Sequence, residues 1–287
     1  MGQYDIREKL LEEYNDVFVD IFNVLMFQGE VLECEKLKDG STESIYKAVN
    51  GDYREQRRDV LKTYLDSCQM AIAFLGVENQ TNIDKYIPIR IMGYDYTKYR
   101  SQIDEDKFPL LPTITIVLNF SNKQWEKCKK LSDIVNIPIE FEPYVQDYEV
   151  RVFDIAFLDD EVINQFKSDF RLIARFFKNR RLGMNPLSDT TEIQHLTELI
   201  DFLTVFTNDA RYGQTKSRLE ELKKKGVKVS MCWVAQELWE KGEAVGENKL
   251  AKLMNCLLTR GLTEEAQKAA SDEIARKEMN LRYGIKD

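Results

Sequence analysis

Two carboxylates and one amide lie on a predicted strand or at the end of one. Asp59 lies on a predicted strand over residues 56–64, and Glu78 closes the apolar run 70–78, with Gln80 two residues further on. A buried acid is costly unless it is paired, and two acids on neighbouring strands repel each other unless a cation lies between them. Carboxylate oxygens bind Mg²⁺, and bound Mg²⁺ holds a phosphate and lowers the pKa of a water. The pattern therefore predicts a metal site suited to phosphodiester hydrolysis.

Gln80 shares a strand face with Glu78, because side chains alternate from one face of a strand to the other. Its amide could therefore hydrogen-bond and orient the attacking water. Taken singly, Asp59 and Glu78 also fit solvated polar residues at strand ends, so their combination with the rest of the chain decides between the two interpretations.

The composition excludes several other kinds of chemistry. The 287 residues include one histidine, His195, and five scattered cysteines, with a formal net charge of −8. A zinc site with two or three histidines cannot be built, and a nucleophile–histidine mechanism would depend on that one residue. Net acidity argues against non-specific coating of nucleic acid and leaves room for a local basic cleft. Short apolar runs and the lack of a signal-peptide pattern predict a cytoplasmic protein with reduced thiols and no membrane partner.

Hydropathy patterns predict the elements that must position these residues. Helical spacing over residues 8–28 is followed by strand patterns over 44–49, 56–64 and 70–78, with a hairpin signal at 50–52. A helix over residues 89–103, strands over 113–120 and 149–158, and a helix from 159 to about 178 follow. The order αβββαβ predicts an α/β fold, with a mixed central sheet flanked by helices.

The breakers Gly183 and Pro186 predict a linker over residues 181–189. It would separate a domain over residues 1–180 from an all-helical C-terminal region over residues 190–287. Helices are predicted there over residues 190–205, 216–225, 230–241, 247–260 and 263–283. Their apolar faces would pack on the first domain or pair two copies of the chain as a homodimer.

Six segments, taken together, resemble the Rpn family of recombination-promoting nucleases and putative transposases, the YhgA-like group of the PD-(D/E)XK nuclease superfamily. The segments are residues 14–22, 57–62, 76–80, 88–96, 115–120 and 152–157. The nineteen-residue step from Asp59 to Glu78 and the sequence Glu-Asn-Gln at 78–80 belong to this likeness. The resemblance spans about residues 8–180, and it is specific as a set rather than through any single motif.

The resemblance implies a restriction-endonuclease-like fold and a DNA endonuclease that depends on Mg²⁺ or Mn²⁺. Asp59, Glu78 and the backbone carbonyl of Asn79 would bind the metal, and Gln80 would orient the water. Two further acids on the first helix are candidates to complete the site, and three arginines are candidate phosphate contacts: Asp16, Asp20, Arg57, Arg58 and Arg90. The arginines also fit strand-edge or surface ion-pair positions, and the basic group at 178–181 is similarly open.

Gln80 departs from the superfamily pattern, which has lysine at this position. A lysine brings a positive charge to a developing hydroxide, whereas a glutamine brings only a dipole. The Rpn-like group itself tends to carry glutamine here. The alternative function is therefore a catalytically degenerate nuclease fold that serves as a DNA-binding or protein-interaction module.

Overall fold

The computed structural model describes residues 11–40, 43–47, 53–57 and 59–285, with backbone only at 43–47, 53–57 and 244–248. The chain divides into two compact units, Met1–Met231 and Cys232–Asp287. Each unit is described by itself below. No helix within the described ranges has the length and apolar character that crossing a membrane requires.

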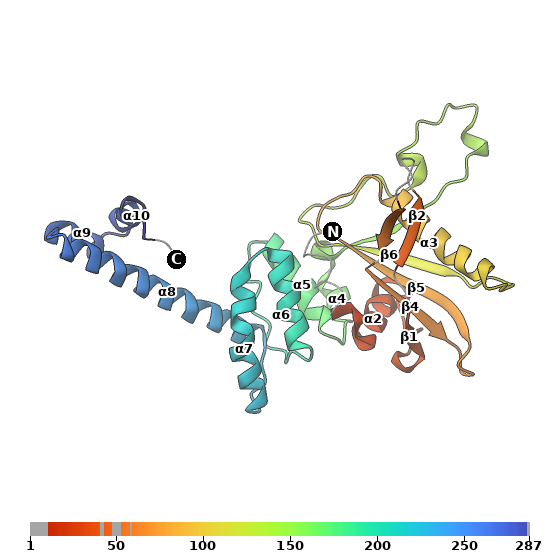
Figure 1. Ribbon diagram of the computed structural model, residues 1–287. Helices are drawn as coiled ribbons and strands as arrows, with labels where there is room; N and C mark the ends of the chain where they lie inside the picture. Colours follow the sequence, from red (N-terminus) through yellow and green to blue (C-terminus); the bar gives the residue numbers. More distant parts are fainter. Residues whose placement is uncertain (1–10, 41–42, 48–52, 58, 286–287) are drawn as a thin grey trace. The chain divides into compact units, whose positions relative to one another are not determined.

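A five-stranded mixed sheet forms the centre of the first unit (Figure 1). Its strands, in spatial order, are β1 (Leu37–Asp39), β4 (Val60–Leu65), β5 (Ala71–Gln80), β6 (Thr113–Asn119) and β7 (Arg151–Asp154). The β1–β4 and β4–β5 pairs are antiparallel, and the β5–β6 and β6–β7 pairs are parallel. The carboxyl ends of β5, β6 and β7 therefore meet at one edge of the sheet. This is the mixed, helix-flanked α/β fold that the sequence predicts.

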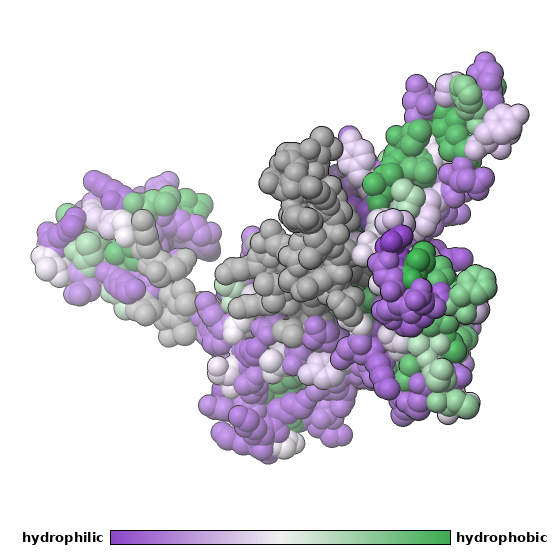
Figure 2. Space-filling view, turned by 45° about the vertical axis from the view of Figure 1, so that its right-hand side comes forward, coloured by the Kyte–Doolittle hydropathy of each residue, from purple (hydrophilic) through white to green (hydrophobic). Residues whose placement is uncertain are grey.

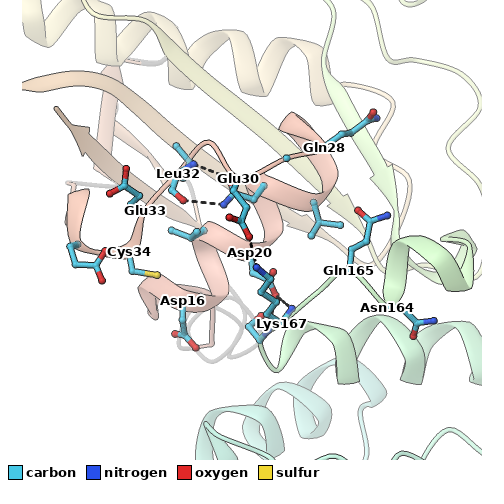
Figure 3. Close-up of a pocket in the computed structure, with 16 residues that line it drawn as sticks. Asp16, Asp20, Gln28, Glu30, Leu32, Glu33, Cys34, Asn164, Gln165 and Lys167 are labelled. Carbon is cyan, nitrogen blue, oxygen red and sulfur yellow. Dashed lines mark hydrogen bonds and ion pairs between the residues drawn. The ribbon is translucent and has the colours of Figure 1, made fainter. Parts of the chain in front are cut away.

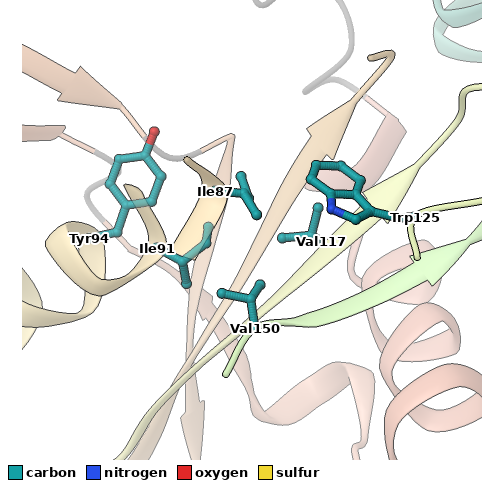
Figure 4. Packing of buried hydrophobic residues seen from close by; sticks show 6 residues of the cluster. All are labelled: Ile87, Ile91, Tyr94, Val117, Trp125 and Val150. Atoms are coloured by element: carbon teal, nitrogen blue, oxygen red, sulfur yellow. The ribbon is translucent and has the colours of Figure 1, made fainter. Parts of the chain in front are cut away.

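Helix α3 (Ile87–Asp104) packs on one face of this sheet (Figure 4). Pro88 stands in its first turn, where its missing N–H costs nothing. The core between helix and sheet consists of buried side chains from α3, β6 and the segments around β7: Ile87, Ile91, Tyr94, Val117, Trp125 and Val150. A hydrogen bond of 2.7 Å from Thr115 Oγ1 to Asp95 Oδ1 adds a polar tie between β6 and α3.

Helix α2 (Asn15–Ile21) continues as a π-helical segment, η1 (Phe22–Phe27), and lies against the opposite face. Lys62 of β4 lies on that face. It is paired with Leu75 of β5, and strand alternation directs both side chains away from the face that α3 covers. Its Nζ lies 5.7 Å from the ring centroid of Phe18 in α2. The helix predicted over 8–28 is thus regular only in its middle, because the backbone is extended at Tyr14, and residues 1–10 lie outside the described ranges.

The predicted strand over residues 56–64 divides into two elements. Strand β3 (Tyr53–Arg57) pairs with β2 (Glu43–Lys47) in a separate two-stranded sheet, and β4 then begins at Val60. The turn expected at 50–52 lies outside the described residues. The division sets Asp59 immediately before β4, at the start of a strand in the central sheet.

Four helices complete the first unit: α4 (Asp160–Ile163), α5 (Phe170–Arg181), α6 (Leu196–Thr207) and α7 (Ala210–Lys224). An aromatic cluster joins them to the sheet. Phe120, just after β6, lies 5.2 Å from Phe177 of α5 and 4.8 Å from Phe206 of α6 between ring centroids. The segment 181–189 lies inside the first compact unit, which extends to Met231.

The second unit is helical, with α8 (Met231–Thr259), α9 (Thr263–Ser271) and α10 (Glu273–Arg282). Helix α8 is continuous where the sequence predicts two helices over 230–241 and 247–260. The helix predicted over 263–283 is broken at Asp272, whose carboxylate accepts hydrogen bonds from the N–H groups of Ile274 and Ala275. Leu253, Leu257, Ala266 and Ala269 form the buried core of this unit.

A long loop over residues 120–150 projects from the sheet of the first unit (Figure 1). A bridge between Lys130 and Glu149 closes its base. Its tip is partly apolar on the surface (Figure 2), with exposed side chains at Ile139, Phe141 and Tyr144.

Candidate functional site

Asp59 and Glu78 meet on one face of the central sheet. Val60 is the partner of Val77 in the antiparallel β4–β5 pair, so the next position outward sets Asp59 opposite Glu78, with both side chains on the same face. The backbone N–H of Asn79 donates to Asp59 Oδ2 at 2.7 Å. The two acids are only 8% and 2% exposed, respectively. The structure therefore brings together the four neighbours that the sequence selects: Asp59, Glu78, Asn79 and Gln80.

Glu78 is the centre of a polar network on the α3 face. Gln80 Nε2 donates to Glu78 Oε1 at 3.2 Å, and an Arg90 Nη group donates to the same oxygen. Arg90 also reaches Asp84 Oδ2 at 3.0 Å. Burial, the largest single influence, would lower the pKa of Arg90, but the charge of Glu78 acts together with Tyr94 and Asp84 to raise the pKa above its usual value. Arg90, predicted as a phosphate contact, thus sits in an ion pair with Glu78.

Tyr94 lies one helical turn after Arg90 and connects this network to the apolar core. Burial and, after it, the negative charge of Glu78 raise the pKa of the Tyr94 phenol to about 12, with a smaller contribution from Asp59 and an opposing one from Arg90. The phenol therefore keeps its proton at neutral pH. Its sensitivity to both charges supports the proximity of the two acids that the strand register indicates.

Asn79 projects to the opposite face of β5, as strand alternation requires. Its Nδ2 donates to Glu12 Oε2 at 2.8 Å, and its buried Oδ1 accepts no hydrogen bond from the described part of the chain. Glu12 is fully buried. Sequence reasoning missed this acid, although it precedes Asp16 by four residues and so extends the acidic stripe seen on the first helix.

Lys62 is a second functional-looking residue that the sequence analysis did not select. The side chain is fully buried, and Nζ donates to Asp39 Oδ1 at 2.6 Å and to the Glu13 carbonyl at 2.7 Å. It lies three residues after Asp59 and therefore on the other face of β4. Lys62 accordingly does not supply the positive charge that Gln80 lacks.

Asp16 and Asp20 line a different site, a cavity of about 950 Å³ between α2 and residues 164–168 (Figure 3). Asp16 Oδ2 lies 2.9 Å from His195 Nε2. Asp20 Oδ2 accepts hydrogen bonds from the backbone N–H groups of Lys167 and Ser168, at 2.8 and 2.7 Å. Neither Asp59 nor Glu78 lines this cavity. The two helix acids therefore serve contacts other than the Asp59–Glu78 pair.

The charge of this cavity makes it unsuited to phosphate. Its described lining carries five acids and one lysine: Asp16, Asp20, Glu30, Glu33, Glu35 and Lys167. Lys167 is itself paired with Glu30 at 2.5 Å. A polyanion would be repelled here, so the cavity, although large, is not the candidate site for nucleic-acid chemistry.

The donor set at the Asp59–Glu78 site fits a hard cation. Mg²⁺ in proteins is commonly held by one or two carboxylates, with water and substrate phosphates completing its shell. Asp59 and Glu78 provide those two carboxylates, and Gln80 adds a neutral amide beside them. Within the described residues, no group of three or more His, Cys, Asp or Glu side chains is placed to hold a metal. Metal binding here would therefore rely on the acid pair.

The remaining candidate phosphate contacts lie at the margin of the described chain. Arg57 ends β3, and its backbone alone is described. Arg58 lies outside the described residues. Both therefore stay predictions.

Comparison with known proteins identifies a family. No curated protein and no solved structure matches the chain. The model of the family described as "Putative transposase, YhgA-like" matches residues 30–209, well over half of the chain. The matched region contains Asp59, Glu78 and Gln80, together with most of the central sheet. The chain therefore belongs to the YhgA-like family of putative transposases.

Proposed function

We propose that the chain is a Mg²⁺- or Mn²⁺-dependent DNA endonuclease that acts in transposition or recombination. Its family suggests a role of that kind, and such roles require phosphodiester bonds to be broken. The observation that carries the proposal is the pair of buried acids, Asp59 and Glu78, on one sheet face beside Gln80.

Each residue of the site has a part in this chemistry. Asp59 and Glu78 would hold the metal, which supplies positive charge for the scissile phosphate and for a water nucleophile. The backbone N–H of Asn79 fixes the orientation of Asp59. Gln80 donates through Nε2 to Glu78, which leaves its carbonyl oxygen as an acceptor for the attacking water. Tyr94, protonated at neutral pH, adds a hydrogen-bond donor next to the acids.

The second candidate function is a nuclease fold without catalysis, kept for binding DNA or protein. One observation favours it: Arg90 already pairs with Glu78, so one of the two acids has a cationic partner within the chain itself. Calorimetry with Mg²⁺ and Mn²⁺ separates the two functions, because the module predicts no heat of binding at millimolar ion and the nuclease predicts a saturable one.

Cleavage of supercoiled plasmid tests the nuclease directly. We expect nicking with Mg²⁺ or Mn²⁺, none in EDTA, and a loss of about 10³-fold for Asp59→Asn or Glu78→Gln, since metal activation contributes several kcal/mol. Asp104→Asn is a matched control, because this exposed acid pairs with Arg100 near the end of α3. Equal nicking by wild type and Asp59→Asn would reject the assignment. Unfolding curves check that each variant is folded.

Pairing of two copies would suit an enzyme that cuts both strands of a duplex. The second unit exposes large apolar side chains that could form such a contact: Trp239, Leu258, Ile274 and Leu281. We therefore propose a homodimer through this unit. Sedimentation of wild type beside Trp239→Asp and Leu281→Asp tests it, and a monomeric wild type would contradict it.

A further inference from the structure

A second polar cleft opens at the carboxyl edge of the parallel strands. It has a volume of about 410 Å³, and its lining comes from the segments that follow β5, β6 and β7 and from the end of α5. Polar side chains and arginines surround an aromatic base formed by Phe120, Phe177 and Phe206. In open α/β sheets, ligands commonly bind in the crevice outside the carboxyl ends of the strands.

The polar lining is of the kind that binds anions. Thr81 and Asn122 provide hydroxyl and amide donors, and Arg180 and Arg181 provide two positive charges. The Ser121 hydroxyl in the same lining donates to the Lys123 carbonyl at 3.0 Å. The described lining contains no aspartate or glutamate, in contrast to the acidic cavity beside α2. In a chain with a formal net charge of −8, a cleft of this composition is a local exception that favours phosphate.

Arg181 is held in place by its surroundings. Its Nε donates to the carbonyl of Ala156 at 2.8 Å, and its guanidinium carbon lies 4.3 Å from the ring centroid of Phe157. The Nη groups make no hydrogen bond to any described residue. A guanidinium fixed in this way offers its remaining N–H donors to a phosphate at little cost in side-chain entropy.

Arg180 is exposed, and among the described residues its guanidinium has no hydrogen bond or ion pair. Asp209 is close enough to feel its charge, but that carboxylate is bound by Arg211 at 2.6 Å. Lys178, the third basic residue of this turn, pairs with Asp160 at 3.0 Å. Basic residues do stabilise helix C-termini, yet that effect does not explain a cleft lined by hydroxyl and amide groups.

The cleft and the acid pair share the end of one strand. Thr81 of the cleft directly follows Gln80, and the N–H of Phe120 donates to the Gln80 carbonyl at 2.8 Å. Glu78 and Gln80 face α3, whereas Phe120 of the cleft points to the other face of the sheet, toward α5 and α6. A nucleic-acid backbone that contacts both sites would therefore cross this edge of the sheet.

We propose that this cleft binds a phosphate of the DNA backbone through Arg180 and Arg181, across the edge of the sheet from the phosphate presented to Asp59 and Glu78. The inference rests on the proposed function, since it adds an anchoring contact for the same DNA. Arg180 and Arg181 are positioning residues: they hold the DNA in register and take no part in bond breaking.

Binding of a fluorescently labelled DNA duplex, measured by anisotropy in EDTA over a series of salt concentrations, tests the cleft without cleavage. We expect Arg180→Ala to raise the Kd by about tenfold at low salt and to make the slope of log K against log salt shallower by about 0.9, as loss of one phosphate contact requires. Arg180→Lys should preserve the slope. Arg100→Ala, an equal change of charge at an exposed site on α3, should alter neither quantity.

Three results would overturn the proposal that the cleft binds phosphate. They are an unchanged salt slope in Arg180→Ala, an equal loss of affinity in Arg100→Ala, and no binding of duplex by the wild type at low salt. Arg180→Ala leaves the packing of Arg181 intact, so its binding data can be interpreted even if Arg181→Ala unfolds the protein. Plasmid cleavage judges the nuclease separately. If the wild type binds DNA through Arg180 but does not cut it, the phosphate-binding cleft is supported and the proposed nuclease activity is rejected.

Discussion

Arg90 and Glu78 form an ion pair at the centre of the candidate site, between the start of α3 and the end of β5. Glu78 is almost fully buried, and about one third of the Arg90 side chain is exposed. A divalent ion at this site would meet a carboxylate that already has a cationic partner. A metal ion bound at Glu78 would therefore compete with the guanidinium of Arg90.

Removing the internal cation should destabilise the protein in a way that metal reverses. Arg90→Ala leaves Glu78 buried beside Asp59, and loss of one partner from a buried pair costs up to 3–5 kcal/mol. Because Arg90 is partly exposed, we expect about 2 kcal/mol in the free energy of unfolding. Millimolar Mg²⁺ should restore most of this loss, and should stabilise the wild type less. Urea unfolding with and without Mg²⁺ measures both quantities.

Arg100→Ala is the control for this experiment, since its pair with Asp104 is exposed on both sides. It should change stability by less than about 1 kcal/mol and should respond to Mg²⁺ only as much as the wild type does. Equal stabilisation of all three proteins by Mg²⁺ would show that the ion does not act at Glu78.

Gln80 should affect the chemical step more than the binding of substrate. Gln80→Ala removes the amide that orients water, so kcat should fall by about 10²-fold while KM stays within a few-fold, a size typical of one lost hydrogen bond in the transition state. Gln80→Lys introduces a positive charge at the developing hydroxide and should recover or exceed wild-type kcat. A KM effect without a kcat effect in Gln80→Ala would assign the residue to binding instead.

The central sheet and the acid pair could be predicted because their signals are local. The runs that form β5 and β6 are continuously apolar and end in polar residues, which marks both the buried strands and their functional end. Glu78 and Gln80 share a face for the simple reason of strand alternation. Strand β1 was missed because it has three residues, too few for a periodic pattern.

The partners of the helix acids could not be predicted, because they are far away in sequence. Asp20 is bound by backbone groups 147 and 148 residues later, and Asp16 by a histidine 179 residues later. The helical periodicity of the sequence identifies the polar stripe, but it carries no information on which residues contact that stripe in the folded protein. The breakers at 181–189 form turns within the first compact unit, and the domain boundary predicted there stays a prediction.

Asp20 provides a prediction about pH. Burial raises the pKa of its carboxyl above the ordinary value of 3.8, although hydrogen bonds from Ser168 and Lys167 act in the opposite direction. The native state therefore holds the proton more tightly than the unfolded state, so the free energy of unfolding falls as pH rises from 3.8 through the raised pKa. Asp20→Asn lacks this titration. Wild-type stability minus Asp20→Asn stability should decrease across that window and level off above it.

Urea unfolding of both proteins over a pH series measures this difference. Asp104→Asn, at an exposed position, should give a nearly flat difference over the same range. A difference that grows with pH would mean that the hydrogen bonds from residues 167 and 168 outweigh burial at Asp20.

Truncation should show where the first folded unit ends. A chain that stops at residue 189 lacks α6, whose Phe202 and Phe206 lie 5.4 and 4.8 Å from Phe120 between ring centroids. It would expose Phe120 and Phe177, and burial of one such side chain contributes about 1.5–3 kcal/mol. We expect that chain to aggregate or to unfold without cooperativity, whereas a chain that stops at Met231 should unfold cooperatively. Circular dichroism during heating compares them, and cooperative unfolding of the 189-residue chain would instead set the boundary at the sequence-predicted linker.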